Sequence, residues 1–215
     1  MNRVEIKEFA KQKIKGNIWN LIWPLLVIGV LESIVSNIFA GSNTALFNID
    51  ASNFDINAIA EATQVSPVSY LINLLFSVIN IAYIKYVLNF VRTGKLEFND
   101  ILNCLKEKWL NILLVSLISS VLIGIGFALF IVPGIILSLG LSMASIIVID
   151  SDLGPIDVLK KSWEMMNGYK WNYFVFILSF LGWILLSPFT FFLLLIWLVP
   201  YMTVAEIIYY EKLKK

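Results

Sequence analysis

The chain has 215 residues, of which 59% are hydrophobic and 14% are Asp, Glu, Lys or Arg. Soluble domains contain about 25% charged residues, and the apolar surplus is too large for one soluble core, so the composition indicates an integral membrane protein. Histidine is absent, Cys104 is the single cysteine, and the formal net charge is +1. These counts exclude an intramolecular disulfide, a zinc site of Cys and His ligands and a histidine-activated nucleophile. They give no sign of nucleic-acid binding, and we expect no cofactor.

Four long apolar segments follow one another along the chain. Residues 18–40 and 68–91 each contain one charged residue, and each is long enough for one membrane span, which needs about 20 residues. Residues 110–149 and 171–205 contain no charge and are too long for one span, so we expect them to fold back at Pro133-Gly134 and Ser187-Pro188. The predicted fold is all-α with six spans, at about residues 18–40, 68–91, 110–132, 134–149, 171–187 and 189–210, and a loop at 41–67.

The basic residues indicate how these spans are oriented. Fifteen of the sixteen Lys and Arg residues lie before the first span, after the second, after the fourth or after the last, whereas the loop at 41–67 contains none. Cytoplasmic loops of membrane proteins carry the excess of Lys and Arg. The sequence therefore predicts that both termini are cytoplasmic, that the loop at 41–67 is extracytoplasmic and that the protein lies in a bacterial cytoplasmic membrane.

Each pair of spans is preceded by an amphipathic helical pattern on the predicted cytoplasmic side and then by a tryptophan. The apolar positions are Ile6, Phe9 or Ala10, and Ile14; Phe98, Ile101, Leu102 and Leu105; and Ile156, Leu159, Trp163 and Met166, and the tryptophans are Trp19, Trp109 and Trp171. The pattern predicts three hairpin units, and either duplication or a shared need for interfacial anchors accounts for it. The amphipathic helices either lie on the inner leaflet or pack beneath the bundle as elbows.

Three charged residues, Glu32, Lys85 and Glu206, fall inside predicted spans, where ionisable groups are functional candidates because their insertion is costly. Glu32 lies deepest, and Asn80 is at a comparable depth, so we expect a hydrogen bond between them. Lys85 and Glu206 both lie near the cytoplasmic ends of their spans, where an ion pair would neutralise both charges. Glu32 is either a proton or cation site or a structural group.

Small residues indicate where helices approach closely. Gly134, Ser138 and Ser142 recur every four residues on the fourth span, which is the spacing of a small-residue packing face. Gly124 and Gly126 on the third span are the expected partners across the turn.

A set of short motifs runs through the second half of the chain. They are Ile131-Val-Pro-Gly-Ile-Ile136, Asp150 with Ser162, Met166-Asn-Gly-Tyr-Lys170, Leu178-Ser-Phe-Leu-Gly-Trp183, Pro200-Tyr201 and Ile208-Tyr-Tyr210. On these residues the chain resembles a family of bacterial multi-pass membrane proteins called domain of unknown function 975. The resemblance implies six spans and no established activity. The wider group is similar to the membrane domain fused to some glycerophosphodiester phosphodiesterases.

Three kinds of function fit the sequence. A non-enzymatic scaffold or accessory subunit, with the lipid bilayer, a second copy or another membrane protein as partner, fits the lack of catalytic motifs best. A small transporter for a solute, ion or lipid would act as an oligomer, with Glu32 in its pathway. An enzyme would need converging carboxylates, and Asp150, Asp152 and Asp157 are the candidates, although helix capping explains them more simply.

The predicted topology fixes the outcome of cysteine labelling. In intact cells, Ser42→Cys in the loop at 41–67 should react with a membrane-impermeant thiol reagent, while Cys104 should be protected because its segment is cytoplasmic. A protected Ser42→Cys together with a labelled Cys104 would show that the orientation is inverted.

Overall fold

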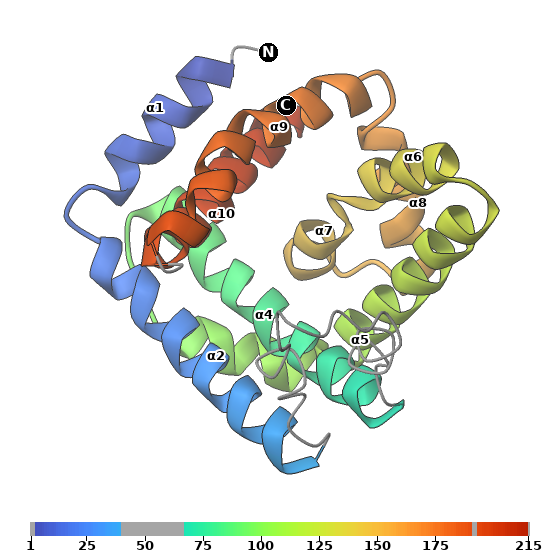
Figure 1. Cartoon of the computed structure of the whole chain (residues 1–215), viewed down its shortest axis with the longest axis horizontal. Coiled ribbons are helices and arrows are strands. Elements are labelled where there is room, and N and C mark those ends of the chain that lie inside the picture. Colours follow the sequence, from blue (N-terminus) through green and yellow to red (C-terminus); the bar gives the residue numbers. More distant parts are fainter. Residues whose placement is uncertain (1–2, 40–66, 191–192, 215) are drawn as a thin grey trace, which may run out of the picture.

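The computed structural model describes residues 3–39, 67–190 and 193–214, and every regular element in these ranges is helical, which confirms the all-α fold class. The elements are α1 (Arg3–Ile14), α2 (Ile18–Phe39), α4 (Pro67–Thr93), α5 (Asn99–Leu129), α6 (Ile131–Leu141), α7 (Ala144–Asp150), α8 (Pro155–Met165), α9 (Lys170–Leu186), the short 3-10 helix η2 (Pro188–Thr190) and α10 (Leu193–Leu213) (Figure 1). The loop predicted at 41–67 falls almost entirely outside the described residues.

Five helical segments in the described ranges are long and apolar enough to cross a membrane: Ile18–Phe39, Val68–Thr93, Asn99–Leu129, Ile131–Asp150 and Leu193–Leu213. The fourth consists of α6 and α7 together. Helices α8 and α9 pass the same test only as a pair that bends by 87° at the break between them, and counting it raises the number to six. The chain is therefore a multi-pass membrane protein with five or six spans, while the hairpin units and their orientation stay predictions.

The break between the third and fourth predicted spans lies earlier than the sequence indicated. Phe130 is extended, with φ −161° and ψ 157°, and it separates α5 from α6. Pro133 instead lies in the first turn of α6, where a missing backbone N–H removes no intrahelical hydrogen bond. The turn predicted at Pro133-Gly134 is therefore wrong, because the chain breaks three residues earlier, at Phe130. The turn predicted at Ser187-Pro188 agrees with the structure, since α9 ends at Leu186 and η2 begins at Pro188.

The amphipathic patterns have different structural outcomes. The second is the N-terminal part of the continuous 31-residue helix α5, so it forms no separate elbow. The third forms α8, which ends before Gly168; this glycine has φ +77°, a conformation that side chains with a Cβ rarely adopt.

Helix α1 packs against α10, beside which it lies in Figure 1. Its buried residues Ile6, Ala10 and Ile14 recur every four positions, whereas Phe9 is exposed. The Tyr201 hydroxyl of α10 donates to the Lys7 carbonyl at 3.3 Å, and the Lys7 ammonium donates to the Ser179 carbonyl of α9 at 2.9 Å. The apolar face of α1 therefore packs as an elbow against protein.

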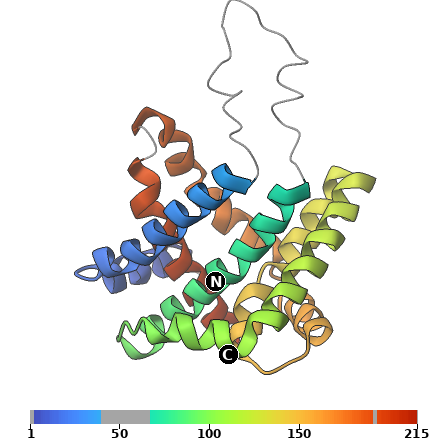
Figure 2. The same cartoon turned by 90° about the horizontal axis from the view of Figure 1, so that it is seen from below.

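Helix α4 contacts α2, α5, α7 and α10. Its Tyr83 and Tyr86 hydroxyls donate to the Leu21 and Asn20 carbonyls of α2, each at 3.1 Å. On its other side, α5 and α6 run together as a hairpin, as Figure 2 shows.

Small residues permit two close helix approaches. A Cβ added to Gly126 of α5 would lie 3.0 Å from the Cα of Gly134 in α6, so these two predicted packing residues meet. Gly124 has open space around it and does not take part in the contact between α5 and α6. The Ser138 and Ser142 hydroxyls donate to the Ile135 and Leu139 carbonyls of their own turns.

The second close approach joins α6 to α8. A Cβ on Gly140 would lie 2.3 Å from a ring carbon of Trp163. The buried Ser162 hydroxyl donates to the Gly140 carbonyl at 2.9 Å, and the Lys170 ammonium lies 3.2 Å from the centre of the Trp163 ring. Gly140 thus allows the indole of α8 to lie directly on the backbone of α6.

We expect Gly140→Ala to lower the free energy of unfolding by about 1–3 kcal/mol, because the added methyl group overpacks the contact with Trp163. Thermal melting in detergent micelles, followed by tryptophan fluorescence, measures the change. Gly182→Ala is the matched control, since nothing lies within 4 Å of its added Cβ; it should leave stability unchanged or raise it by about 0.5–1 kcal/mol. Equal melting temperatures for the two variants would contradict the Gly140 contact.

Candidate functional site

The two deepest predicted polar residues do not meet. The Asn80 side-chain amide donates to the Phe76 carbonyl one turn earlier in α4, at 3.0 Å. Glu32 is half-buried in α2 and forms no hydrogen bond or ion pair with any described residue. The expected Glu32–Asn80 hydrogen bond is therefore absent from the described structure, where the Asn80 amide instead bonds within its own helix.

The ion pair expected between Lys85 and Glu206 is also absent from the described structure. The Lys85 ammonium donates to the Ile149 carbonyl of α7 at 3.2 Å, near a helix C-terminus, where backbone carbonyls attract cations. Glu206 of α10 instead accepts a hydrogen bond from the Tyr173 hydroxyl of α9. The two residues lie at similar predicted depths, but they face different neighbours.

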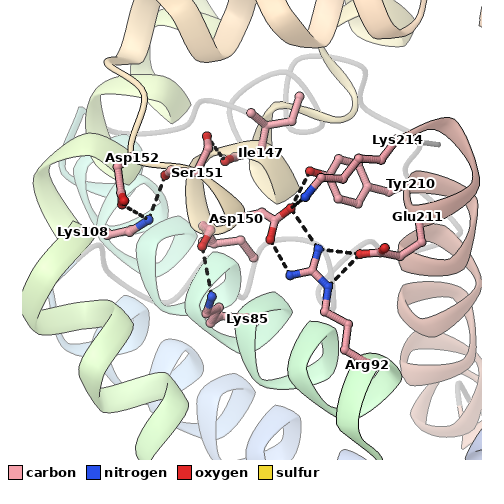
Figure 3. Close-up of polar contacts among 11 residues, drawn as sticks. Lys85, Arg92, Lys108, Ile147, Asp150, Ser151, Asp152, Tyr210, Glu211 and Lys214 are labelled. Carbon is pink, nitrogen blue, oxygen red and sulfur yellow. Dashed lines mark hydrogen bonds and ion pairs between the residues drawn. The ribbon is translucent and has the colours of Figure 1, made fainter.

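The strongest polar cluster gathers around Asp150, a residue that the sequence suggested as a helix cap. Arg92 binds both oxygens of the carboxylate, and its Nη2 lies 2.9 Å from Oδ2. The Tyr210 hydroxyl and the Lys214 ammonium each donate to Oδ2 at 2.7 Å. Arg92 also donates to Glu211 through Nε at 2.8 Å. We call Arg92, Asp150, Tyr210, Glu211 and Lys214 the Asp150 cluster (Figure 3).

Three helix ends hold this cluster in place. Arg92 lies in the last turn of α4 and Asp150 is the last residue of α7. Tyr210 and Glu211 lie near the end of α10, and Lys214 follows it. The Asp150 side chain is only 5% exposed, and a carboxylate so buried needs cations and hydrogen-bond donors around it. The cluster therefore joins the ends of α4, α7 and α10.

A second group of charges lies on the α5 side of Asp150. The Lys108 ammonium donates to the Ser151 carbonyl and pairs with Asp152, each at 2.8 Å. Hydrogen bonding and charge from Lys108 lower the pKa of the exposed Asp152 carboxyl. A cavity of about 340 Å³ lies between these groups, lined by Lys85, Asp100, Asn103, Cys104, Glu107, Lys108, Ile149, Asp150 and Asp152.

The charged groups of this region are placed to hold helices together. Asp150 faces three donors, so its carboxylate is held as an acceptor and is not placed as a free general base. Asp152 is paired with Lys108, while Asp157 lies on α8 at 4.0 Å from Lys160. The three carboxylates that the sequence suggested for an enzyme thus have separate partners. Among the described residues, no group of three or more His, Cys, Asp or Glu is placed to hold a metal ion.

Sequence reasoning missed the partners of Asp150. In the sequence, Arg92 is one of the basic residues after the second predicted span that indicate orientation, and Tyr210 belongs to a motif that carries the family resemblance. The available signal was the presence of opposite charges at the ends of three predicted spans. Charge and depth alone do not say which ends are adjacent, so the cluster required the three-dimensional structure.

We expect Asp150→Asn to lower the free energy of unfolding by about 2–4 kcal/mol, because it leaves Arg92 and Lys214 facing a neutral group. Thermal melting in detergent micelles is the measurement. Asp157→Asn is the control, since Asp157 is exposed and its pair with Lys160 is long; its effect should be below about 1 kcal/mol.

The double variant Arg92→Gln/Asp150→Asn tests whether the two residues act together. Its destabilisation should be clearly smaller than the sum of the two single effects, because each single change already breaks the same pair. Strict additivity would contradict the ionic junction.

Comparisons with known proteins give a match to one protein family. No curated protein and no solved structure matches the chain. Residues 127–215 match the model of a family described as "Protein of unknown function (DUF975)". The matched part runs from the end of α5 to the C-terminus and contains Asp150, Tyr210, Glu211 and Lys214. This match supports the resemblance to that family that the sequence motifs indicate.

Proposed function

We propose that the protein is a non-enzymatic scaffold or accessory subunit of the bacterial cytoplasmic membrane, which presents apolar helix faces to lipid and to a membrane-protein partner or a second copy of itself. The observation that carries this proposal is how little of two spans is buried. Only 22% of the most apolar part of α2 and 17% of that of α5 is buried inside the protein.

The outer face of α2 shows the kind of surface available. Val27, Val30, Ile34 and Ile38 recur three or four residues apart, which places them along one face of the helix, and all are exposed. An apolar, charge-free face of this length fits hydrocarbon chains or the apolar face of another spanning helix.

The polar groups support the same proposal from inside the structure. The Asp150 cluster pairs its charges with one another and joins three helix ends. These groups stabilise the arrangement of the helices, which is what a scaffold needs from its polar residues. We extend the proposal to three hairpin units with both termini in the cytoplasm, since the basic residues favour that orientation.

A transporter is the alternative, and one observation favours it. Glu32 is a carboxylate within a spanning helix that is half-buried and has no partner among the described residues. A carboxylate inside a membrane commonly belongs to a proton or ion pathway. The alternative therefore depends on one side chain.

The scaffold proposal is tested by cross-linking in native membranes. Val30→Cys on the outer face of α2, where Val30 is 58% exposed, should give a discrete adduct with a thiol-reactive cross-linker. Ile28→Cys, at a position 7% exposed, is the matched control and should give none. The native Cys104 is buried, so the introduced thiol dominates the reaction. Absence of any adduct at Val30→Cys would contradict an α2 scaffold surface.

Glu32→Gln separates the scaffold from the transporter. For a scaffold, proteoliposomes with wild-type protein should show the same proton and cation leakage as those with the variant, measured with a pH-sensitive dye and an ion indicator. A flux that Glu32→Gln abolishes while the amount of inserted protein stays constant would overturn the scaffold proposal.

A further inference from the structure

The junction between α1 and α2 carries cations that have no ion-pair partner among the described residues. Lys11 and Lys15 are exposed and Lys13 is half-buried, and none of their side chains has an ion pair or hydrogen bond with a described residue. Trp19 and Trp23 follow one turn apart on α2 and are 67% and 61% exposed. We call these five residues the α1–α2 elbow.

Packing fixes the elbow in its outward orientation. The buried stripe of α1 lies against α10, and an ion pair of 3.1 Å joins Glu5 of α1 to Lys212 of α10. Lys7 is held by its hydrogen bond to Ser179 and lies 4.0 Å from the centre of the Phe180 ring. Lys11 and Lys15 lie one helical turn apart and are exposed, whereas Lys13 lies on another side of α1 and is half-buried.

The local charge is strongly positive. Residues 3–15 contain five basic and two acidic side chains, and one of the acidic ones, Glu5, is already paired with Lys212. Glu8 is the other acidic residue, and it is exposed without an ion pair to a described residue. A charge surplus next to two exposed indole rings matches the level of lipid headgroups, where tryptophan rings lie and anionic lipids attract lysines.

An apolar groove begins close to the elbow. It has a volume of about 260 Å³ and lies between α2 and α10, lined by Ile22, Leu25, Leu26, Leu195, Ile196 and Val199. Its first residue, Ile22, is four positions after the start of α2 at Ile18, which is about 6 Å along the helix axis. The groove is lined only by apolar side chains inside two spanning segments, so hydrocarbon is the material that fits it.

We propose that the α1–α2 elbow binds an anionic phospholipid, with its phosphate at Lys11 and Lys15, which lie on one side of α1, and one acyl chain in the groove between α2 and α10. Lys13 adds to the positive charge beside the headgroup. The lysines supply charge complementarity to the phosphate, and the tryptophans lie at the headgroup level. A ligand that fills the apolar groove must have a hydrocarbon chain. A phospholipid has one, whereas a free phosphate does not. This site goes beyond the scaffold proposal, because it requires no protein partner and stands whether or not the cross-linking experiment succeeds.

The site is tested on the full-length protein in detergent with two lipids that have the same acyl chains. Native mass spectrometry measures binding of phosphatidylglycerol and phosphatidylcholine, and melting temperatures without lipid confirm that each variant is folded. Wild-type protein should bind phosphatidylglycerol in preference to phosphatidylcholine. Lys11→Gln/Lys13→Gln/Lys15→Gln should weaken phosphatidylglycerol binding about 100-fold, since each lysine near an anionic headgroup contributes about fivefold in affinity.

A second triple variant controls for general charge effects. Lys95→Gln/Lys106→Gln/Lys161→Gln removes three lysines elsewhere, two exposed and one half-buried, that also have no ion pair with a described residue. It should bind as the wild type does. Equal loss in both triple variants, or no preference for phosphatidylglycerol in the wild type, would overturn the site.

A groove variant distinguishes a lipid from a free phosphate. Val199→Phe narrows the groove and should weaken lipid binding, whereas Leu193→Phe, on an exposed position of α10 outside the groove lining, should not. Glycerol phosphate, which carries at least as much negative charge but no acyl chains, should bind far more weakly than the lipid. Binding of glycerol phosphate as tight as that of phosphatidylglycerol, or no effect of Val199→Phe, would overturn the assignment of a phospholipid.

Discussion

The pairing of Arg92 with Asp150 is the contact on which the described arrangement of helices depends. A carboxylate that is 5% exposed at the end of a spanning segment is stable only where donors surround it. Those donors come from the end of α4 and from Tyr210 and Lys214 at the end of α10. Their convergence fixes α10 against α4 and α7, and α10 in turn provides the surface on which α1 packs. The orientation of the α1–α2 elbow thus follows from a junction formed far from it in sequence.

The parts of the fold that the sequence predicted are those set by lengths and periods along one helix. The bilayer requires a minimum apolar length, so the runs that begin at Ile18 and Val68 indicated α2 and α4 almost to their observed bounds. The spacing of Ile6 and Ile14, with Phe9 or Ala10 between them, indicated the buried face of α1 because helical side chains three or four apart share a face, and the structure shows that Ala10 is the buried one. Both properties can be predicted from one helix without knowing its neighbours.

The parts that the sequence did not predict depend on neighbours across the structure. A residue count gives depth along a span but not the direction in which a side chain points, so Lys85 and Glu206 were matched by depth although they face α7 and α9. Composition also does not distinguish a turn at Pro133 from one at Phe130, since a proline is tolerated in the first turn of a helix. The continuous helix α5 shows the same limit, because nothing in an amphipathic pattern prevents it from continuing into a span.

The distribution of polar contacts separates the groups that hold the protein together from those available to a ligand. Arg92 and Lys214 balance the charges of Asp150 and Glu211, and Lys108 with Asp152 does the same nearby. A charge paired within the protein offers little to a partner, since binding would first have to break that pair. The lysines of the elbow have no such competitor among the described residues, and an apolar groove begins about 6 Å along α2. In a protein surrounded by phospholipid, the anionic headgroup is the counter-ion present at the highest concentration beside them.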